Sequence, residues 1–121
     1  MPNILFMTDK FEVEQFLKQL KQHIEIWEIV FVSRDKNDLQ TLADLEITAN
    51  KRKDIIKNLK CQDYSSGPIN ETQYGGSSMW IFGKIIKRTE IYIKLTISQH
   101  TQDVICISFH KAEHPMDFPL N

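Results

Sequence analysis

The hydrophobic pattern of this chain changes its period once, and that change limits the fold more than any other feature. Between about residues 8 and 60, apolar side chains recur every three or four positions, which predicts two to three amphipathic helices. From residue 79 to about 110 they alternate with polar side chains, which predicts strands. Helices followed by consecutive strands are typical of an α+β fold, so we expect N-terminal helices packed on a small antiparallel sheet.

Local signals place the elements of the helical half. The first helix should begin near Lys10, after a cap at Thr8 or Asp9, and the third after a cap at Thr48. A short strand is expected over 29–33. The second helix presents a leucine stripe made of Leu39, Leu42 and Leu45.

The second half begins with glycine, proline and serine clusters at 65–68 and 75–78, which predict a long loop over 61–78. The tail, 111–121, contains two prolines and should cross the surface as extended chain. Three strands should form an antiparallel meander, at 79–87, 90–97 and 104–109. We therefore expect a single domain over 1–121, with helices at about 8–60, the loop, a sheet at about 79–110 and the tail.

Composition excludes several classes of protein. Hydrophobic residues make up 41% and charged residues 26% of the 121, as in ordinary globular domains. No apolar run approaches the ~20 residues that span a bilayer. Residues 1–7 are too short and uncharged for a secretory signal, so we expect a cytoplasmic protein without membrane contact. Cys61 and Cys106 lie far apart and should be free thiols in a reducing compartment.

Charge is distributed unevenly along the chain, although the net charge is only −1. Residues 1–47 hold five basic and nine acidic residues, a balance of −4. Residues 48–121 hold ten basic and seven acidic residues, a balance of +3. The second part can attract a polyanion, and a solvated helix and hairpin surface is the alternative interpretation.

The strand pattern predicts which side chains share a face of the sheet. In the second strand of the meander the isoleucines should face the helices, which leaves Tyr92 and Lys94 on the open face. In the third strand we expect the core set to be Ile105, Ile107 and Phe109. Cys106, Ser108 and His110 would then share the open face, and His110 would lie opposite Tyr92 if Ile93 lies opposite Phe109.

The first strand of the meander has two alternative placements. A three-residue connection puts Lys84 beside Lys94 on the open face, together with Trp80 and Phe82. A two-residue turn puts Lys84 on the core side, where a lysine in the middle of a strand is uncommon. We therefore expect the first arrangement.

The resulting open face suits RNA. Aromatic rings can stack on bases, lysines neutralise phosphate, and a histidine exchanges protons near neutral pH. Each residue alone is also compatible with an ordinary packing or surface role. The spacing of His110, Glu113 and His114 is a further alternative, a zinc site, but Pro115 prevents the helix that would align the histidines, so we expect no metal and no cofactor.

Five short motifs in the second half of the chain carry a resemblance to a known family. They are Asp63-Tyr64-Ser65-Ser66-Gly67-Pro68, Trp80-Ile81-Phe82-Gly83-Lys84, Ile91-Tyr92-Ile93-Lys94-Leu95, Cys106-Ile107-Ser108-Phe109-His110 and Ala112-Glu113-His114-Pro115-Met116. Over about residues 11–119 the chain resembles the MqsR toxin family. The resemblance implies a RelE-like fold, a ribosome-independent mRNA interferase activity and neutralisation by a cognate antitoxin protein, with a homodimer or a toxin–antitoxin hetero-oligomer as the assembly.

The resemblance casts Tyr92 as an active-site residue and puts His110 where the family carries a basic residue. The chain departs from the family at Ser66, where the family has a lysine nearby, and at Ile81, where it has a glutamine. The catalytic residues are predicted to be Tyr92, His110, Lys94 and Lys84. The predicted RNA contacts are Trp80, Phe82, Arg88 and Tyr64.

The expected function is therefore metal-independent cleavage of mRNA by the toxin of a toxin–antitoxin pair. The alternative is a non-catalytic module that binds a protein or a nucleotide through its open sheet face, with the aromatic side chains supplying the binding energy.

Overall fold

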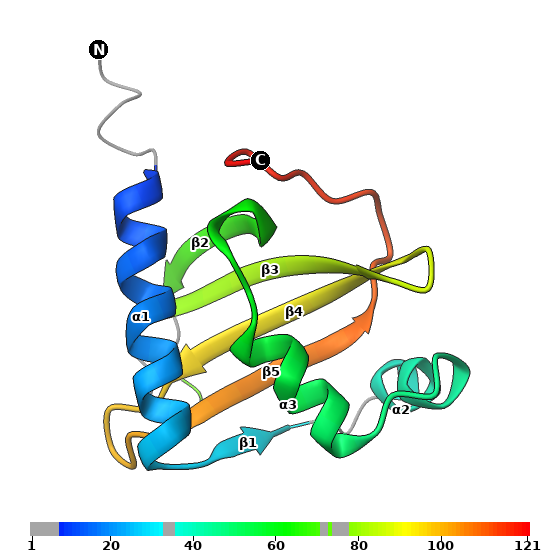
Figure 1. Ribbon diagram of the computed structural model, residues 1–121, viewed down its shortest axis with the longest axis horizontal. Helices are drawn as coiled ribbons and strands as arrows, with labels where there is room; N and C mark the ends of the chain where they lie inside the picture. Colours follow the sequence, from blue (N-terminus) through cyan, green and yellow to red (C-terminus); the bar gives the residue numbers. More distant parts are fainter. Residues whose placement is uncertain (1–7, 33–35, 71–72, 74–77) are drawn as a thin grey trace.

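Three helices occupy the first half of the chain, where the apolar spacing predicts them (Figure 1). They are α1 (Lys10–Ile26), α2 (Lys36–Asp44) and α3 (Ala49–Lys57) in this computed structural model, which describes residues 8–32, 36–70, 73 and 78–121. The Asp9 side chain accepts a hydrogen bond from the Glu12 N–H at 2.9 Å and so caps α1. Thr48 caps α3 in the same way, as predicted.

Five strands form one sheet, and the fold is α+β, as expected. The strands are β1 (Ile29–Phe31), β2 (Tyr64–Asn70), β3 (Ser78–Ile86), β4 (Thr89–Ile97) and β5 (Val104–Lys111), in the spatial order β1-β5-β4-β3-β2. The predicted meander is confirmed, since β3, β4 and β5 pair antiparallel in sequence order. The short strand β1 lies parallel to β5, so the sheet is mostly rather than wholly antiparallel.

Strand β2 lies where a loop was predicted, so that expectation is wrong for residues 64–70. Gly67 and Pro68 are loop signals, but β2 is an edge strand, which tolerates proline, and its pairing with β3 is irregular on both sides of Ser66. Gly67 has a φ of 112°, and a Cβ there would lie 2.7 Å from the Met79 carbonyl oxygen. Glycine therefore lets β2 approach β3 closely. Of the rest of the predicted loop, Cys61–Asp63 form a single turn of 3-10 helix, η2, and residues 71–72 and 74–77 lie outside the described residues.

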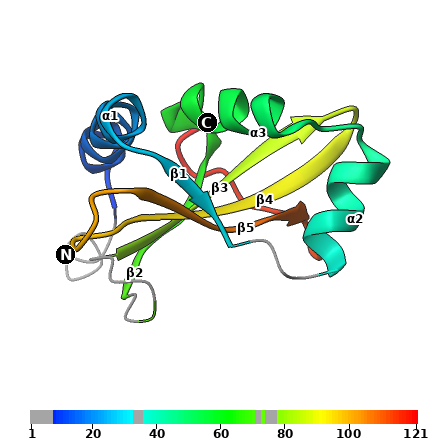
Figure 2. The same ribbon diagram turned by 90° about the horizontal axis from the view of Figure 1, so that it is seen from below.

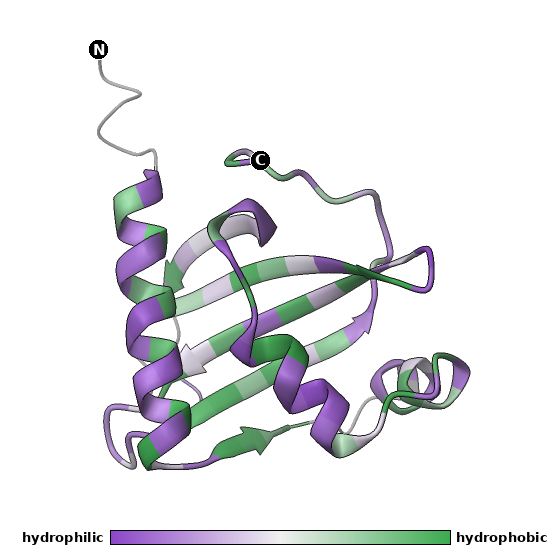
Figure 3. Cartoon of the chain, in the orientation of Figure 1, coloured by the Kyte–Doolittle hydropathy of each residue, from purple (hydrophilic) through white to green (hydrophobic). Residues whose placement is uncertain are grey.

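The helices α1 and α3 cover one face of the sheet (Figures 1 and 2). Figure 3 shows α1 banded along its length, as expected of an amphipathic helix with one buried stripe. In the described ranges no helix is long and apolar enough to cross a membrane. The core between the layers includes Val13, Phe16, Leu20, Ile24, Ile56, Leu59, Phe82, Ile91, Ile93, Leu95, Val104 and Phe109.

The hairpin between β3 and β4 closes with two residues, not three, and this reverses a prediction. Ile86 pairs with Thr89, and the two turn residues, Lys87 and Arg88, have φ values of 50° and 65°. Two left-handed residues match the twist of a tight hairpin. One residue fewer in the turn moves every side chain of β3 to the opposite face. Lys84 therefore lies on the helix-covered face, opposite Ile91.

A bulge in β5 reverses a second prediction. Lys94 pairs with Ser108, but Leu95 pairs with Cys106, so Ile107 is an extra residue. Phe109 faces the core on one side of the bulge and Cys106 faces it on the other, and Cys106 is fully buried. Ile107 is only half-buried and lies outside the core cluster, whereas Ile105 lies opposite Thr96 on the other face. The expected core set is thus wrong for Ile107, whereas Ile105 is buried as expected but faces away from the main core cluster.

Candidate active site

Tyr92 and His110 lie side by side on the face of the sheet that the helices leave open. They occupy opposite positions in β4 and β5, as the alternation of the strands predicted. Their rings are stacked, with centroids 5.1 Å apart and planes 13° apart. The pair combines a phenol hydroxyl and an imidazole, both of which can exchange protons, at the end of β5.

The strand end that carries His110 is held firmly by α2. Asp38 accepts a hydrogen bond from the Phe109 N–H at 3.4 Å, and Thr41 accepts one from the Lys111 N–H at 3.0 Å. The two residues that flank His110 are thereby fixed to a helix. These bonds replace the strand pairing that β1 provides farther along the same edge of β5.

A hydrogen bond also determines which ring nitrogen of His110 is free to accept a proton. The Nδ1 atom lies 2.8 Å from the Lys111 carbonyl oxygen, which can only accept, so Nδ1 carries a proton. In the neutral ring Nε2 then keeps its lone pair. His110 is therefore arranged to accept a proton at Nε2.

Lys94 supplies positive charge next to this pair. It lies two residues beyond Tyr92 on the same face, opposite Ser108, and its Nζ is 5.7 Å from the centre of the Tyr92 ring. Among the described residues it forms no ion pair, so its charge is available to an anion. Stacked rings beside a free ammonium group are well matched to a base and a phosphate.

These side chains line a cleft of about 520 Å³ between the open face and the C-terminal segment. Strand β2 adds Ser65 and Ser66, and Ile81 on β3 adds an apolar wall. The lining residues from the sheet are Ser65, Ser66, Ile81, Tyr92, Lys94, Ser108 and His110, and the C-terminal segment adds residues 112–117.

Lys84, predicted to stand beside Lys94, is not part of this cleft. Its Nζ pairs with the Asp63 carboxylate at 3.2 Å on the opposite face of the sheet. Asp63 is buried and also accepts a hydrogen bond from the Lys60 N–H at 2.9 Å. A lysine is tolerated in the middle of β3 because this carboxylate neutralises it.

The predicted aromatic RNA contacts are core residues, and the expectation that Trp80 and Phe82 lie on the open face is wrong. Phe82 is fully buried, and Trp80 and Tyr64 are 8% and 5% exposed. Trp80 stacks on Phe16 of α1 with ring centroids 4.7 Å apart. These rings therefore have almost no free face for a base. Arg88 is exposed in the hairpin turn and does not line the cleft, so its RNA contact stays a prediction.

Several lining residues could not be found from strand alternation alone. Ser65 and Ser66 reach the cleft because β2 joins the sheet, and that strand is obscured by its Gly-Pro signal. Glu113 and His114 reach it because the chain turns back after β5. The sequence did associate His114 with His110. Among the residues described, no group of three or more His, Cys, Asp and Glu side chains could hold a metal ion.

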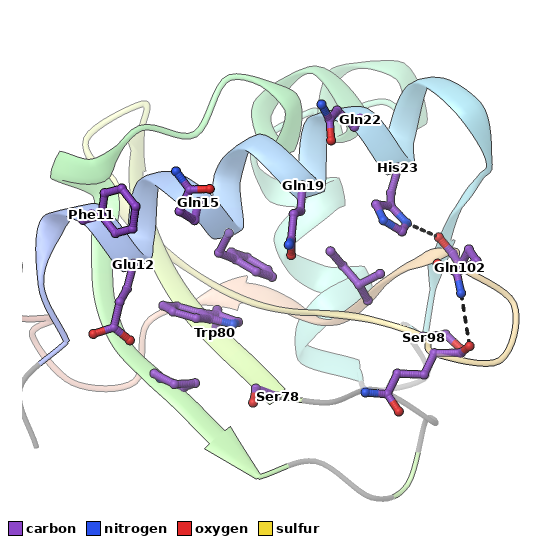
Figure 4. Close-up of a pocket in the computed structure, with 14 residues that line it drawn as sticks. Phe11, Glu12, Gln15, Gln19, Gln22, His23, Ser78, Trp80, Ser98 and Gln102 are labelled. Carbon is purple, nitrogen blue, oxygen red and sulfur yellow. Dashed lines mark hydrogen bonds between the residues drawn. The ribbon is translucent and has the colours of Figure 1, made fainter.

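A second cavity, of about 670 Å³, lies on the helix side between α1 and the opposite end of the sheet (Figure 4). Figure 4 shows Gln19 and His23 extending from α1, with His23 hydrogen-bonded to Gln102. Its described lining contains no lysine or arginine, and Glu12 is its one carboxylate. A phosphate would find no cation there, so the first cleft is the better candidate for RNA. Five glutamines contribute to this lining: Gln15, Gln19, Gln22, Gln99 and Gln102.

Comparison with known proteins identifies no relative. No protein-family model matches the chain, and neither the curated proteins nor the solved structures contain a significant match.

Proposed function

We propose that the chain is a metal-independent endoribonuclease whose active site is the cleft on the open face. The observation that carries the proposal is the stacked pair of Tyr92 and His110 beside Lys94, which has no ion-pair partner among the described residues. The motif resemblance to MqsR-type toxins supports the same reaction. It further suggests a RelE-like toxin that acts on mRNA in the cytoplasm and is neutralised by a cognate antitoxin protein.

The residues of the cleft suffice for cleavage by the neighbouring 2′-hydroxyl. His110 Nε2 accepts the 2′-hydroxyl proton, and the 2′-oxygen forms a bond to phosphorus. The Lys94 ammonium group stabilises the charge that develops on the phosphate oxygens. The bond from phosphorus to the 5′-oxygen breaks, and the Tyr92 hydroxyl donates the proton that the leaving oxygen takes up. The products are a 2′,3′-cyclic phosphate and a 5′-hydroxyl, and His110 then returns its proton through solvent to Tyr92.

The first prediction tests this role of His110. His110→Ala should cleave a single-stranded RNA about 10²- to 10⁴-fold more slowly than the parent, because a general base is lost. His100→Ala is the matched control, since His100 is exposed in the turn between β4 and β5, and it should cleave at the parental rate. Rates are measured with purified full-length proteins in the presence of a chelator, and melting temperatures show whether each variant folds.

Expression of the parent in bacteria should arrest growth, and His110→Ala should relieve the arrest. Parental cleavage by His110→Ala would show that the catalytic assignment is wrong. A folded parent that binds RNA or a protein but never cleaves would favour the non-catalytic module instead.

A further inference from the structure

The C-terminal segment, residues 112–121, leaves the end of β5 and passes β3 (Figure 1), and its residues 112–117 line the cleft on the open face. Two hydrogen bonds to Glu90, at the start of β4, direct its path. The Ala112 N–H donates to the Glu90 carbonyl oxygen at 2.9 Å, and the Met116 N–H donates to its side-chain Oε1 at 3.3 Å. The segment is thereby fastened across the end of the cleft that holds His110.

Gly83 has no side chain and so leaves the space in which this segment packs on β3, which we call its seat. It lies opposite Tyr92 in the sheet, and a Cβ at this position would be 2.8 Å from both the Met116 Sδ and the Phe118 ring. The two side chains therefore occupy the space that any other residue in β3 would fill. Farther along, Leu120 packs against the hydrophobic core. The crossing is thus a packed part of the fold.

When it is packed at Gly83, the segment changes the net charge of the residues that line the cleft. The sheet residues that line the cleft carry a single full charge, the positive charge of Lys94, when the histidine is counted as neutral. The segment adds two carboxylates, Glu113 and Asp117, and with them the lining has a net charge of −1. Neither carboxylate forms an ion pair with any residue that the structure describes. Both therefore act on whatever enters the cleft.

We propose that residues 112–121 form an autoinhibitory strap, which closes the cleft to polyanions until it lifts from Gly83. The inference rests on the proposed function, because it regulates the same site. Two carboxylates repel a phosphodiester chain that approaches Lys94, so the seated strap opposes binding. Displacement of the strap removes Glu113 and Asp117 from the cleft and leaves Lys94 and His110 on the sheet face, with the Glu90 carboxylate at the end where the strap was bound. The strap then acts as a switch between a closed and an accessible active site.

The second prediction tests the charge of the strap. The full-length double variant Glu113→Gln with Asp117→Asn should bind a fluorescent 2′-O-methyl RNA oligonucleotide about 5-fold more tightly than the parent, because two repulsive charges are removed. The matched control is Glu25→Gln with Asp54→Asn, which changes the net charge equally on exposed positions of α1 and α3. The gain should disappear at ~1 M salt, where charges are screened within ~3 Å.

A second variant tests the seat itself. Gly83→Val should keep the sheet, since valine favours strands, but should displace Met116 and Phe118. Hydrogen exchange of the Met116 amide should become faster in this variant, and the 2′-O-methyl RNA should again bind more tightly. Thermal melting confirms that the variant is folded.

The outcomes separate this inference from the proposed function, because the 2′-O-methyl probe cannot be cleaved. If the strap variants bind the probe more tightly while no protein cleaves RNA, the strap is retained and the nuclease assignment fails. If the parent cleaves RNA but the strap variants bind the probe no better than the charge control, the strap proposal is overturned.

Discussion

At the scale of single residues, two lysines on neighbouring strands have opposite roles. Lys94 projects from the open face without an ion-pair partner among the described residues, whereas Lys84 is held on the helix-covered face by Asp63 at 3.2 Å. Both were predicted to stabilise phosphate, and only Lys94 is placed to do so. The difference arises because a one-residue change in a turn exchanges the two faces of a strand.

The third prediction separates the two lysines by matched substitutions. Lys84→Met should cost about 1–3 kcal/mol of unfolding free energy, because it leaves the buried Asp63 carboxylate without its cation, and should leave RNA cleavage unchanged. Lys94→Met should slow cleavage by about 10²-fold, because the phosphate charge loses its cation, while stability changes by less than about 0.5 kcal/mol. Urea unfolding and cleavage rates measure the two effects. A reversed pattern would restore Lys84 to the active site.

At the scale of elements, the bulge in β5 decides which side chains build the core and which build the cleft. Ser108 and His110 remain on the open face, while the extra residue, Ile107, lets Cys106 turn inward opposite Leu95. Without the bulge Ile107 would point into the core and Cys106 would join the open face. The same irregularity therefore positions both the buried thiol and the strand end that carries His110.

The fourth prediction tests which side chains of β5 and of its neighbour β4 are buried in the core. Leu95→Ala should destabilise the protein by about 2–5 kcal/mol, because Leu95 is fully buried and its truncation leaves a cavity. Ile107→Ala should cost only about 1 kcal/mol, since the side chain is half-buried outside the core cluster. Chemical denaturation of both variants measures the difference. Equal losses would place Ile107 in the core after all.

At the scale of the whole molecule, a single core between the helices and the sheet governs stability, and it contains one ionisable thiol. Burial raises the pKa of the Cys106 thiol from 9.0 to about 12, because the thiolate would lose its hydration. In the unfolded chain the same thiol ionises near its ordinary value. The folded protein therefore holds this proton over a pH range in which the unfolded chain releases it.

The fifth prediction follows from this difference in proton binding. Because the folded state binds the extra proton, the Cys106 contribution to stability is full below pH 9.0 and decreases as the pH rises toward about 12. Cys106→Ala should show a shallower loss of unfolding free energy between about pH 8 and about pH 10 than the parent. Cys61→Ala is the comparison for a partly buried thiol at the edge of the core, whose pKa burial also raises. Identical slopes for all three proteins would contradict the burial of Cys106.

Periodicity and local capping were enough to locate most of the elements. The spacing of Val13, Phe16, Leu20 and Ile24 predicts α1, the caps at Asp9 and Thr48 mark helix starts, and alternation predicts the β3–β5 meander. These features depend on interactions between residues close in sequence. The pairing of Tyr92 with His110 was also predictable, because the bulge lies beyond this pair and leaves its register intact.

Tertiary structure alone decided which residues meet in the cleft. The face of the sheet on which Trp80, Phe82 and Lys84 lie depends on the two-residue turn at 87–88. Local sequence patterns do not distinguish a two-residue turn from a three-residue turn. The charge of the half-buried Lys84 is balanced by Asp63, which is distant in sequence. The path of residues 112–121 depends on the seat at Gly83 and the bonds to Glu90. The sequence by itself thus determined most of the elements and one residue pair of the candidate site, because local energies suffice for these, whereas β2 and the composition and charge of the cleft arise from contacts between distant segments.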